Sequence, residues 1–194
     1  MKIELVDCFD SFSWNLAAAL SNHGDVVTTR VDALEVERAS VADLLVLGPG
    51  PGTPDHYPAL FALLERRSDR PVFGVCLGFQ AQCLFEGGRL KRGAPVHGMT
   101  ASLLHDGGSE FRDVPQRSEV MRYHSLIIEE VGRDFEVCAT TPDGITMAAR
   151  HTSRPWFGVQ FHPESVASQD GARLIDNVIA GWVIAGWIVG ERNG

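Results

Sequence analysis

The chain has 194 residues, 44% of them hydrophobic and 22% charged, and a formal net charge of −8. This length and composition are typical of one globular domain with a full core, and we expect that domain to span residues 1–194. The acidic balance argues against a surface that binds nucleic acid or an anionic membrane.

The cysteines and the first residues bear on the compartment. The four cysteines form no C-x-x-C pair: Cys8, Cys76, Cys83 and Cys138. We therefore expect neither a disulfide framework nor a zinc site, and we expect the protein to lie in a reducing compartment. Glu4 and Asp7 interrupt the apolar run that a signal peptide would need, and the apolar stretch 178–190 is too short to span a bilayer. We expect a cytoplasmic protein.

Strands and helices alternate in the first half of the chain. Apolar runs predict strands over residues 3–6, 26–31, 43–47 and 71–75. Between them, Asp10-Ser11 is expected to cap a helix that Gly24 ends, and residues 57–67 and 77–85 have helical apolar spacing. This alternation predicts an α/β fold, in which helices cover both faces of a mostly parallel sheet.

The pattern changes after Gly87-Gly88. Turn residues separate short runs that look like strands, over residues 101–105, 119–122, 135–140, 145–150 and 156–161. We expect this half to add antiparallel strands to the sheet, and a final helix to cover residues 169–187.

A candidate nucleophile lies between the fourth strand and the next helix. Cys76 has glycines two residues before and after it, Gly74 and Gly78, which is the thiol form of the G-x-S-x-G elbow. The elbow would present Cys76 at a helix N-terminus, where the helix dipole favours the reactive thiolate. A lone cysteine is more often a small buried hydrophobe, but the elbow favours the catalytic interpretation here.

A candidate base follows a later strand. His162 and Glu164 are two residues apart, so on a strand their side chains would share one face, and Pro163 would end the strand between them. Active sites of open α/β sheets lie at the carboxyl ends of strands. We therefore expect His162 as the base for Cys76 and Glu164 as the group that orients it.

Two further segments are candidates for the pocket. The repeat over residues 48–52 lacks the Gly-Lys-Ser/Thr of a phosphate loop; it is either a rigid turn or an oxyanion hole, with the Leu77 N–H as its partner. The polar segment 122–126 is expected to form a wall of the substrate pocket, rather than to supply His124 as a third catalytic group. Asp10 suits a capping role better than a metal site.

Together these motifs resemble the class I (triad-type) glutamine amidotransferases, and more closely the glutaminase subunits of the chorismate-utilising anthranilate and aminodeoxychorismate synthases. The resemblance covers nearly the whole chain, and the matching segments are residues 7–16 (D-x-x-D-S-F-x-x-N-L), 48–52, 74–80, 97–98, 122–126 and 158–165. Phe79 stands where this subfamily usually has histidine, and Met99 stands where it usually has lysine.

The resemblance implies a flavodoxin-like fold that hydrolyses L-glutamine to glutamate and ammonia, with no metal and no cofactor. It implies that Cys76 attacks the side-chain amide, that His162 acts as base and then as acid, and that Glu164 orients His162. The other site residues carry over in the same way: Gly50 and Leu77 as oxyanion donors, Gln80, Ser125 and Leu126 at the amino-acid end of glutamine, and Pro51 and Gly52 as pocket wall.

A partner is expected because ammonia is useful only when it is delivered, and 194 residues leave no room for a chorismate-binding domain. We therefore expect a separate chorismate-binding synthase subunit. The alternatives are a glutaminase subunit for a different acceptor synthase, and a non-catalytic regulatory homologue, against which the intact triad argues. The apolar stretch 178–190 is expected to make a protein contact through Trp182 or Trp187.

Overall fold

The computed structural model describes residues 1–67, 69–93 and 98–188. Its main sheet has eight strands in the order β2-β1-β3-β4-β12-β11-β10-β7. Their bounds are β1 Lys2–Asp7, β2 Asp25–Arg30, β3 Leu44–Leu47, β4 Val72–Val75, β7 Leu104–His105, β10 Phe135–Thr140, β11 Thr146–His151 and β12 Trp156–Val159. Neighbours from β2 to β12 pair in parallel, and β11, β10 and β7 are added antiparallel, as predicted.

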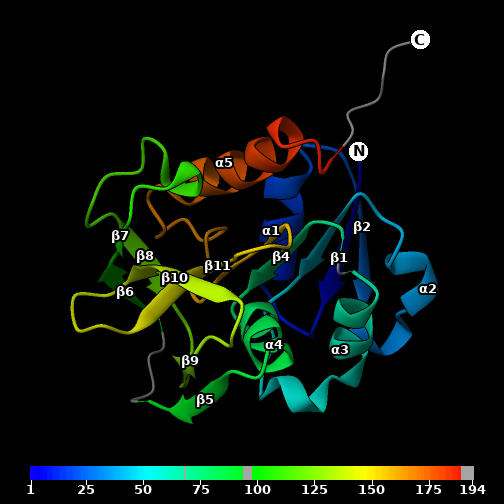
Figure 1. Ribbon diagram of the computed structural model, residues 1–194, viewed down its shortest axis with the longest axis horizontal. Helices are drawn as coiled ribbons and strands as arrows, with labels where there is room; N and C mark the ends of the chain where they lie inside the picture. Colours follow the sequence, from blue (N-terminus) through cyan, green and yellow to red (C-terminus); the bar gives the residue numbers. More distant parts are fainter. Residues whose placement is uncertain (68, 94–97, 189–194) are drawn as a thin grey trace.

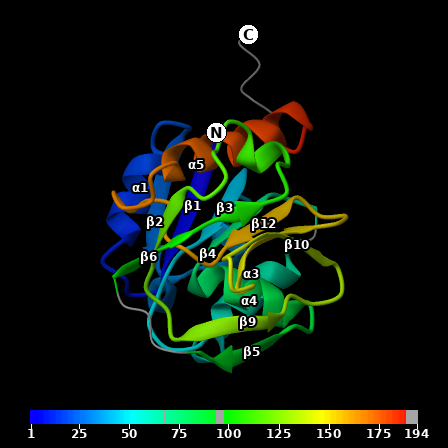
Figure 2. The same ribbon diagram turned by 90° about the vertical axis from the view of Figure 1, so that its left-hand side faces the viewer.

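Helices cover both faces of this sheet (Figures 1 and 2). They are α1 Ser13–Leu20, α2 Val36–Ala39, α3 Pro58–Glu65, α4 Leu77–Phe85 and α5 Gly171–Ile184, with 3-10 turns at Val31–Ala33, Pro54–His56 and Ser109–Phe111. Helices α1 and α5 pack with one core cluster, whereas α2, α3 and α4 pack with the other. The predicted α3 stripe of Leu60, Leu63 and Leu64 is buried as expected.

Two small antiparallel ribbons lie outside the main sheet. The first pairs β5 (Arg89–Arg92) with β9 (Leu126–Glu130), and the second pairs β6 (Met99–Ser102) with β8 (Glu119–Arg122). Figure 2 shows β5 and β9 below the main sheet. The strand predicted over residues 101–105 is wrong as a single element, because the chain passes from β6 to β7, and so from a ribbon to the main sheet, through the buried Leu103.

Two helix ends differ from the sequence expectation. Helix α1 begins at Ser13 with Phe12 as its N-cap residue and no side-chain cap, and it ends at Leu20, well before Gly24. The Asp10 carboxylate instead accepts a hydrogen bond from the Phe12 N–H (2.8 Å), so it holds the turn that precedes the helix.

The last helix is shorter than predicted. Helix α5 covers Gly171–Ile184, and Gly186 then takes a φ of 75°, while the Trp187 N–H donates to the Trp182 carbonyl (2.9 Å). This is a glycine-terminated Schellman end. The Trp182 side chain is buried, which rules it out as a surface anchor, and Trp187 is 44% exposed. Residues 189–190 of the apolar stretch, like His97, lie outside the described residues.

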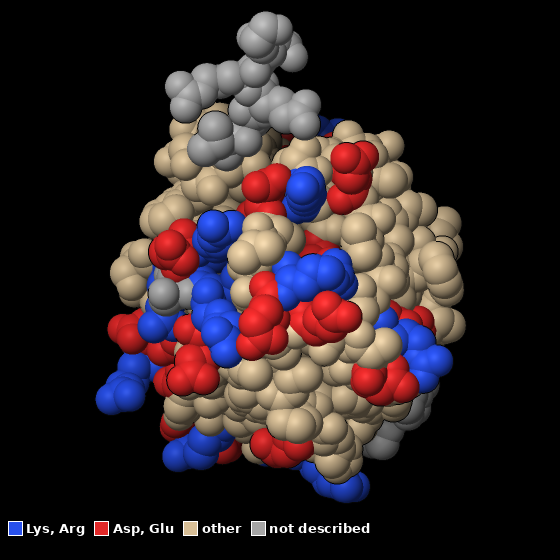
Figure 3. Space-filling model, turned by 90° about the vertical axis from the view of Figure 1, so that its right-hand side faces the viewer, with Lys and Arg blue, Asp and Glu red and all other residues tan. Residues whose placement is uncertain are grey.

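The face of the molecule that forms the right-hand side of Figure 1 carries both acidic and basic side chains. Figure 3 shows acidic and basic side chains interspersed on this face. This face therefore presents no continuous basic area. Among the helices that the structure describes, none has the length and apolar character needed to cross a membrane.

Candidate active site

The Cys76 elbow forms as predicted between β4 and α4. Cys76 has a φ of 52° and a ψ of −102°, a backbone conformation that only glycine adopts without cost. The flanking glycines are required by close packing, because a Cβ at Gly74 would meet Gln82 and one at Gly78 would meet the Leu47 carbonyl. The elbow thus presents the Cys76 thiol at the start of α4.

His162 and Glu164 form a buried pair. His162 Nδ1 lies 2.8 Å from Glu164 Oε1, and the two side chains are 2% and 0% exposed. The sequence suggested that these two residues lie on a strand, but β12 ends before them, at Val159. A single bridge in which the His162 N–H donates to the Met121 carbonyl (3.0 Å) holds the segment instead.

Cys76 and His162 interact electrostatically. Burial alone would lower the pKa of His162, but interactions with Cys76 and Glu164 outweigh it and raise that pKa to about 10. The imidazole therefore keeps its proton at neutral pH, which favours a thiolate on Cys76. The three groups can act as nucleophile, base and orienting carboxylate.

A cavity of about 620 Å³ opens in front of Cys76. Six of the predicted pocket residues line it: Gly50, Pro51, Gly52, Gln80, Ser125 and Leu126. Leu77 does not line it; its side chain is buried in the core behind the loop, and only its position next to Cys76 relates it to the site. Phe79 is also buried, and its ring lies edge-on to the Phe135 ring with 6.3 Å between the centroids. The phenylalanine that stands where the subfamily usually has histidine therefore belongs to the core and not to the cavity wall.

The loop over residues 48–52 is tightly packed. A Cβ at Gly50 would lie 2.5 Å from the Cys8 Cβ and 2.9 Å from Leu77 Cδ2, so this position has room only for glycine. Gly52 has a φ of 81°, and the Tyr57 hydroxyl donates to the Pro51 carbonyl (2.9 Å). The loop is thereby held against the start of α4.

His124 lines the cavity but is not placed to act as a base. Its Nε2 accepts from Arg122 Nε (3.1 Å), and its Nδ1 donates to the Leu126 carbonyl (2.7 Å). Burial and the Arg122 charge lower the pKa of His124 to about 4. The ring is neutral with both nitrogens occupied, which agrees with a wall role for this segment. The same Leu126 carbonyl and the Gln160 side chain hold the Gln80 amide.

The β1–α1 loop also reaches the site, which the sequence analysis missed. Phe9, Asp10, Ser11 and Phe12 line the cavity. The Phe12 ring lies 5.0 Å from the His162 ring, measured between centroids. The signal that could have found this loop is its position after the first strand of a parallel sheet, at the edge where such sheets build their sites.

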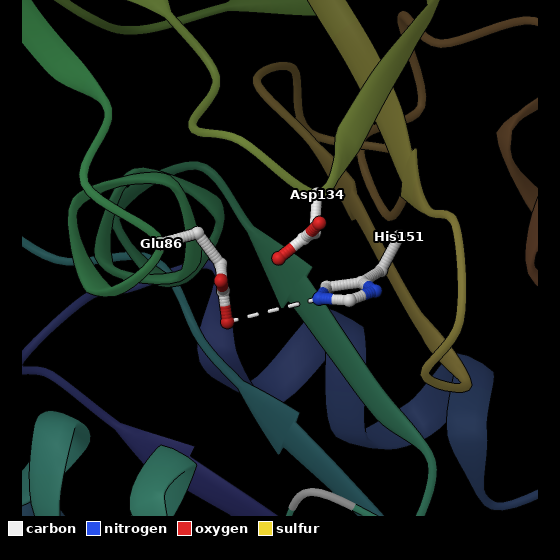
Figure 4. Close-up of side chains that lie close together, drawn as sticks. All are labelled: Glu86, Asp134 and His151. Atoms are coloured by element: carbon white, nitrogen blue, oxygen red, sulfur yellow. Dashed lines mark ion pairs between the residues drawn. The ribbon is translucent and has the colours of Figure 1, made fainter.

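One cluster elsewhere has the composition of a metal site. Ligand atoms of Glu86, Asp134 and His151 lie within 4.8 Å of one another (Figure 4). His151 Nδ1, however, accepts the N–H groups of Ser153 (3.2 Å) and Arg154 (3.1 Å). In the neutral ring Nε2 then carries the proton, which leaves no lone pair for a metal ion there.

Glu86 already has a cation. Arg154 Nη1 lies 2.5 Å from Glu86 Oε1, and His151 Nε2 lies 3.7 Å from the same oxygen. Glu86 follows the last residue of α4, so the cluster links the far end of the helix that starts at Cys76 to the β11–β12 turn. These contacts suit a structural clamp better than a metal centre.

Comparison with known proteins gives a consistent result. Residues 4–182 match the family model described as glutamine amidotransferase class-I. The chain is 44% identical over 185 residues to aminodeoxychorismate synthase of Streptomyces griseus, and the alignment covers 91% of this chain and 25% of that protein. It is 37% identical over 191 residues to anthranilate synthase component 2 of Methanothermobacter thermautotrophicus, and this alignment covers 91% of this chain and 97% of that protein.

Solved structures share the fold. The crystal structure of a putative GMP synthase protein from Thermoplasma acidophilum superposes with a TM-score of 0.85 at 23% identity, and the match covers 96% of this chain and 95% of that one. A glutamine amidotransferase from Thermotoga maritima superposes with a TM-score of 0.70 at 19% identity, over 95% and 83% of the two chains. The predicted flavodoxin-like architecture is thus confirmed at the level of fold.

Proposed function

The chain belongs to the class-I glutamine amidotransferases, and on that basis we propose that it hydrolyses L-glutamine and delivers the ammonia to a chorismate-binding synthase. The observation that carries the proposal is that Cys76, which lines the cavity, interacts with the buried His162–Glu164 pair. The cavity is large enough for an amino acid and is lined by the segments that the family motifs identify.

The triad residues have separate roles in this reaction. The Cys76 thiolate attacks the side-chain amide carbon, and the carbonyl oxygen becomes an oxyanion. The His162 imidazolium gives its proton to the departing nitrogen, so ammonia leaves and a glutamyl thioester remains on Cys76. His162, now neutral, takes a proton from water, which attacks the thioester and releases glutamate. Glu164 keeps the imidazole oriented and stabilises its charged form.

The oxyanion and the substrate need hydrogen-bond donors. The backbone N–H groups of Gly50 and Leu77 are the proposed oxyanion donors, supported by the close packing of Gly50 on Leu77. Gln80, Ser125 and Leu126 are proposed to hold the amino-acid end of glutamine, while Pro51 and Gly52 form the pocket wall.

The acceptor synthase is inferred from relatives. The chain spans 25% of the Streptomyces aminodeoxychorismate synthase, but 97% of anthranilate synthase component 2 and 96% of the Archaeoglobus fulgidus component. Both kinds of enzyme are named for products made from chorismate, so we propose a chorismate-binding synthase as the partner.

The test is to supply the chain to a purified chorismate-binding synthase, with chorismate and L-glutamine, and to identify the amine by chromatography and mass spectrometry. We expect a glutamine-dependent amine whose structure identifies the acceptor reaction. Glutamate release without any chorismate-derived amine would keep the glutaminase activity and reject the partner. No glutamate release under any condition would reject both.

A further inference from the structure

The glutamine cavity has an uneven charge. Among the described residues that line it, Asp10 is the one carboxylate, and there is no lysine or arginine. His124 is neutral there, because both of its ring nitrogens are occupied. L-Glutamine brings one α-ammonium and one α-carboxylate into this cavity, and among the described lining residues Asp10 is the carboxylate that could pair with the ammonium group.

The loop that carries Asp10 is held in place before any ligand binds. Phe9 has a φ of 67°, uncommon for a residue with a side chain, and the Arg30 guanidinium lies 4.8 Å from its ring centroid. The Asp10 N–H donates to Asp7 Oδ1 (3.1 Å), and Asp10 Oδ1 accepts from the Phe12 N–H (2.8 Å). A strained backbone that its surroundings maintain is a common feature of ligand-binding loops.

These contacts leave one oxygen of Asp10 available. Oδ2 accepts no hydrogen bond from the part of the chain that the structure describes, and no ion pair within it involves Asp10. Resting on the glutaminase activity proposed above, we infer that the Asp10 carboxylate binds the α-ammonium group of L-glutamine. A charge-assisted hydrogen bond of this kind is stronger than a neutral one, and its loss selectively penalises ligands that carry the ammonium group.

Covalent labelling of Cys76 can isolate this contact. The probes are the diazoketone analogue of L-glutamine, in which a diazomethyl ketone replaces the amide, and the same compound without the α-amino group. The Cys76 sulfur bonds to the diazo carbon, which takes up a proton and loses N₂. The variant is Asp10→Asn, which keeps an oxygen for the Phe12 N–H and removes the charge. Asp7→Asn is the matched control, because Asp7 ends β1 three positions before Asp10, does not line the cavity, and as asparagine keeps an Oδ1 acceptor for the Asp10 N–H.

We expect Asp10→Asn to lower the second-order labelling rate of the amino-bearing probe by about tenfold or more, the effect of losing one charge-assisted hydrogen bond. The desamino probe and iodoacetamide should label Asp10→Asn and the parent protein alike, and Asp7→Asn should label normally with all reagents. Equal rates for the amino-bearing probe in Asp10→Asn and the parent would overturn the inference, as would an equal fall for both diazoketones. If the parent protein itself is not labelled at Cys76, the proposed function fails instead.

Discussion

Cys76 combines a rare backbone conformation with a thiol that lines the cavity. If its thiolate is the nucleophile of amide hydrolysis, Cys76→Ser should abolish glutamine-dependent amine formation, with a loss of about 10⁴-fold or more, because no other group can form the covalent intermediate. The synthase supplied with ammonium salt should continue to form product. Steady-state rates with each nitrogen donor measure both effects. Glutamine-dependent turnover that survives in Cys76→Ser would remove Cys76 from the mechanism.

The positive φ of Cys76 should also affect the free energy of unfolding. A residue with a Cβ is strained by about 1–3 kcal/mol at such a position, and glycine is not. We therefore expect Cys76→Gly to have a free energy of unfolding about 1 kcal/mol higher than Cys76→Ala, measured by urea denaturation. Comparing these two variants removes the effect of losing the sulfur. A less stable Cys76→Gly would mean that the elbow is not strained.

The raised pKa of His162 has a consequence for reactivity. Because that pKa lies at about 10, His162 stays cationic through neutral pH and favours the Cys76 thiolate until the imidazolium deprotonates near pH 10. Iodoacetamide should therefore alkylate Cys76 at pH 6.5 at least about tenfold faster in the parent protein than in His162→Gln. In His162→Gln the rate should rise only in the range of ordinary thiols, near about pH 8.5. Identical pH profiles would mean that no thiolate–imidazolium pair forms.

At the scale of single elements, α4 is fixed at both ends. Its first turn follows the Cys76 elbow, and Glu86, which follows its last turn, pairs with Arg154 and faces His151. The Glu86 side chain is only 11% exposed, so losing its charge removes the carboxylate that pairs with Arg154 and leaves a polar group in a largely buried position. We expect Glu86→Gln to lower the free energy of unfolding by about 1–3 kcal/mol in urea denaturation.

Glu129→Gln is the control for this clamp. Glu129 pairs with Lys91 (3.3 Å) across the β5–β9 ribbon, but its side chain is 40% exposed. Exposed pairs contribute little, so this variant should change stability by less than about 0.5 kcal/mol. Equal effects of the two substitutions would contradict the clamp.

The elements that could be predicted from sequence are those with an apolar pattern facing the core. The bounds of α4, β8 and β10 match the expectation, since their buried positions show in the spacing. The ribbon strand β5 was missed because its residues are largely charged and exposed. Its register depends on cross-strand pairs such as Arg89–Glu130 (2.6 Å), and the sequence of β5 alone does not specify that partner.

At the scale of the whole molecule, the site brings together segments that are distant in sequence. Local motifs were enough to single out Cys76, His162 and Glu164 as candidates, because elbow spacing and the His-Pro-Glu tripeptide are short-range signals. The place of Asp10 in the same cavity depends on the sheet order, in which β1 lies beside β3 and β3 beside β4. That order brings the carboxyl ends of β1 and β4 to one edge, and no spacing between Asp10 and Cys76 encodes it.

The open mouth of this cavity bears on how ammonia would be used. Phe9 and Tyr123 line the cavity and are 47% and 40% exposed, so in the isolated chain ammonia released at Cys76 can leave into water. A synthase that covers this mouth would exclude water and fix the loops around the substrate, which commonly raises kcat/KM. We therefore expect the isolated chain to be a weak glutaminase, and the synthase to raise kcat/KM for glutamine by about tenfold or more.

Glutamate release at a series of glutamine concentrations, with and without the synthase, measures this effect. The Cys76→Ala chain mixed with the same synthase is the control, because it reports any glutaminase activity that the partner brings. The packing of Gly50 against Cys8 and Leu77 leaves the loop over residues 48–52 little room to move alone. We therefore expect the synthase to act mainly by closing the mouth of the cavity, so that KM for glutamine falls more than kcat rises. Equal turnover with and without the synthase at saturating and at low glutamine would show that the site is complete in the isolated chain.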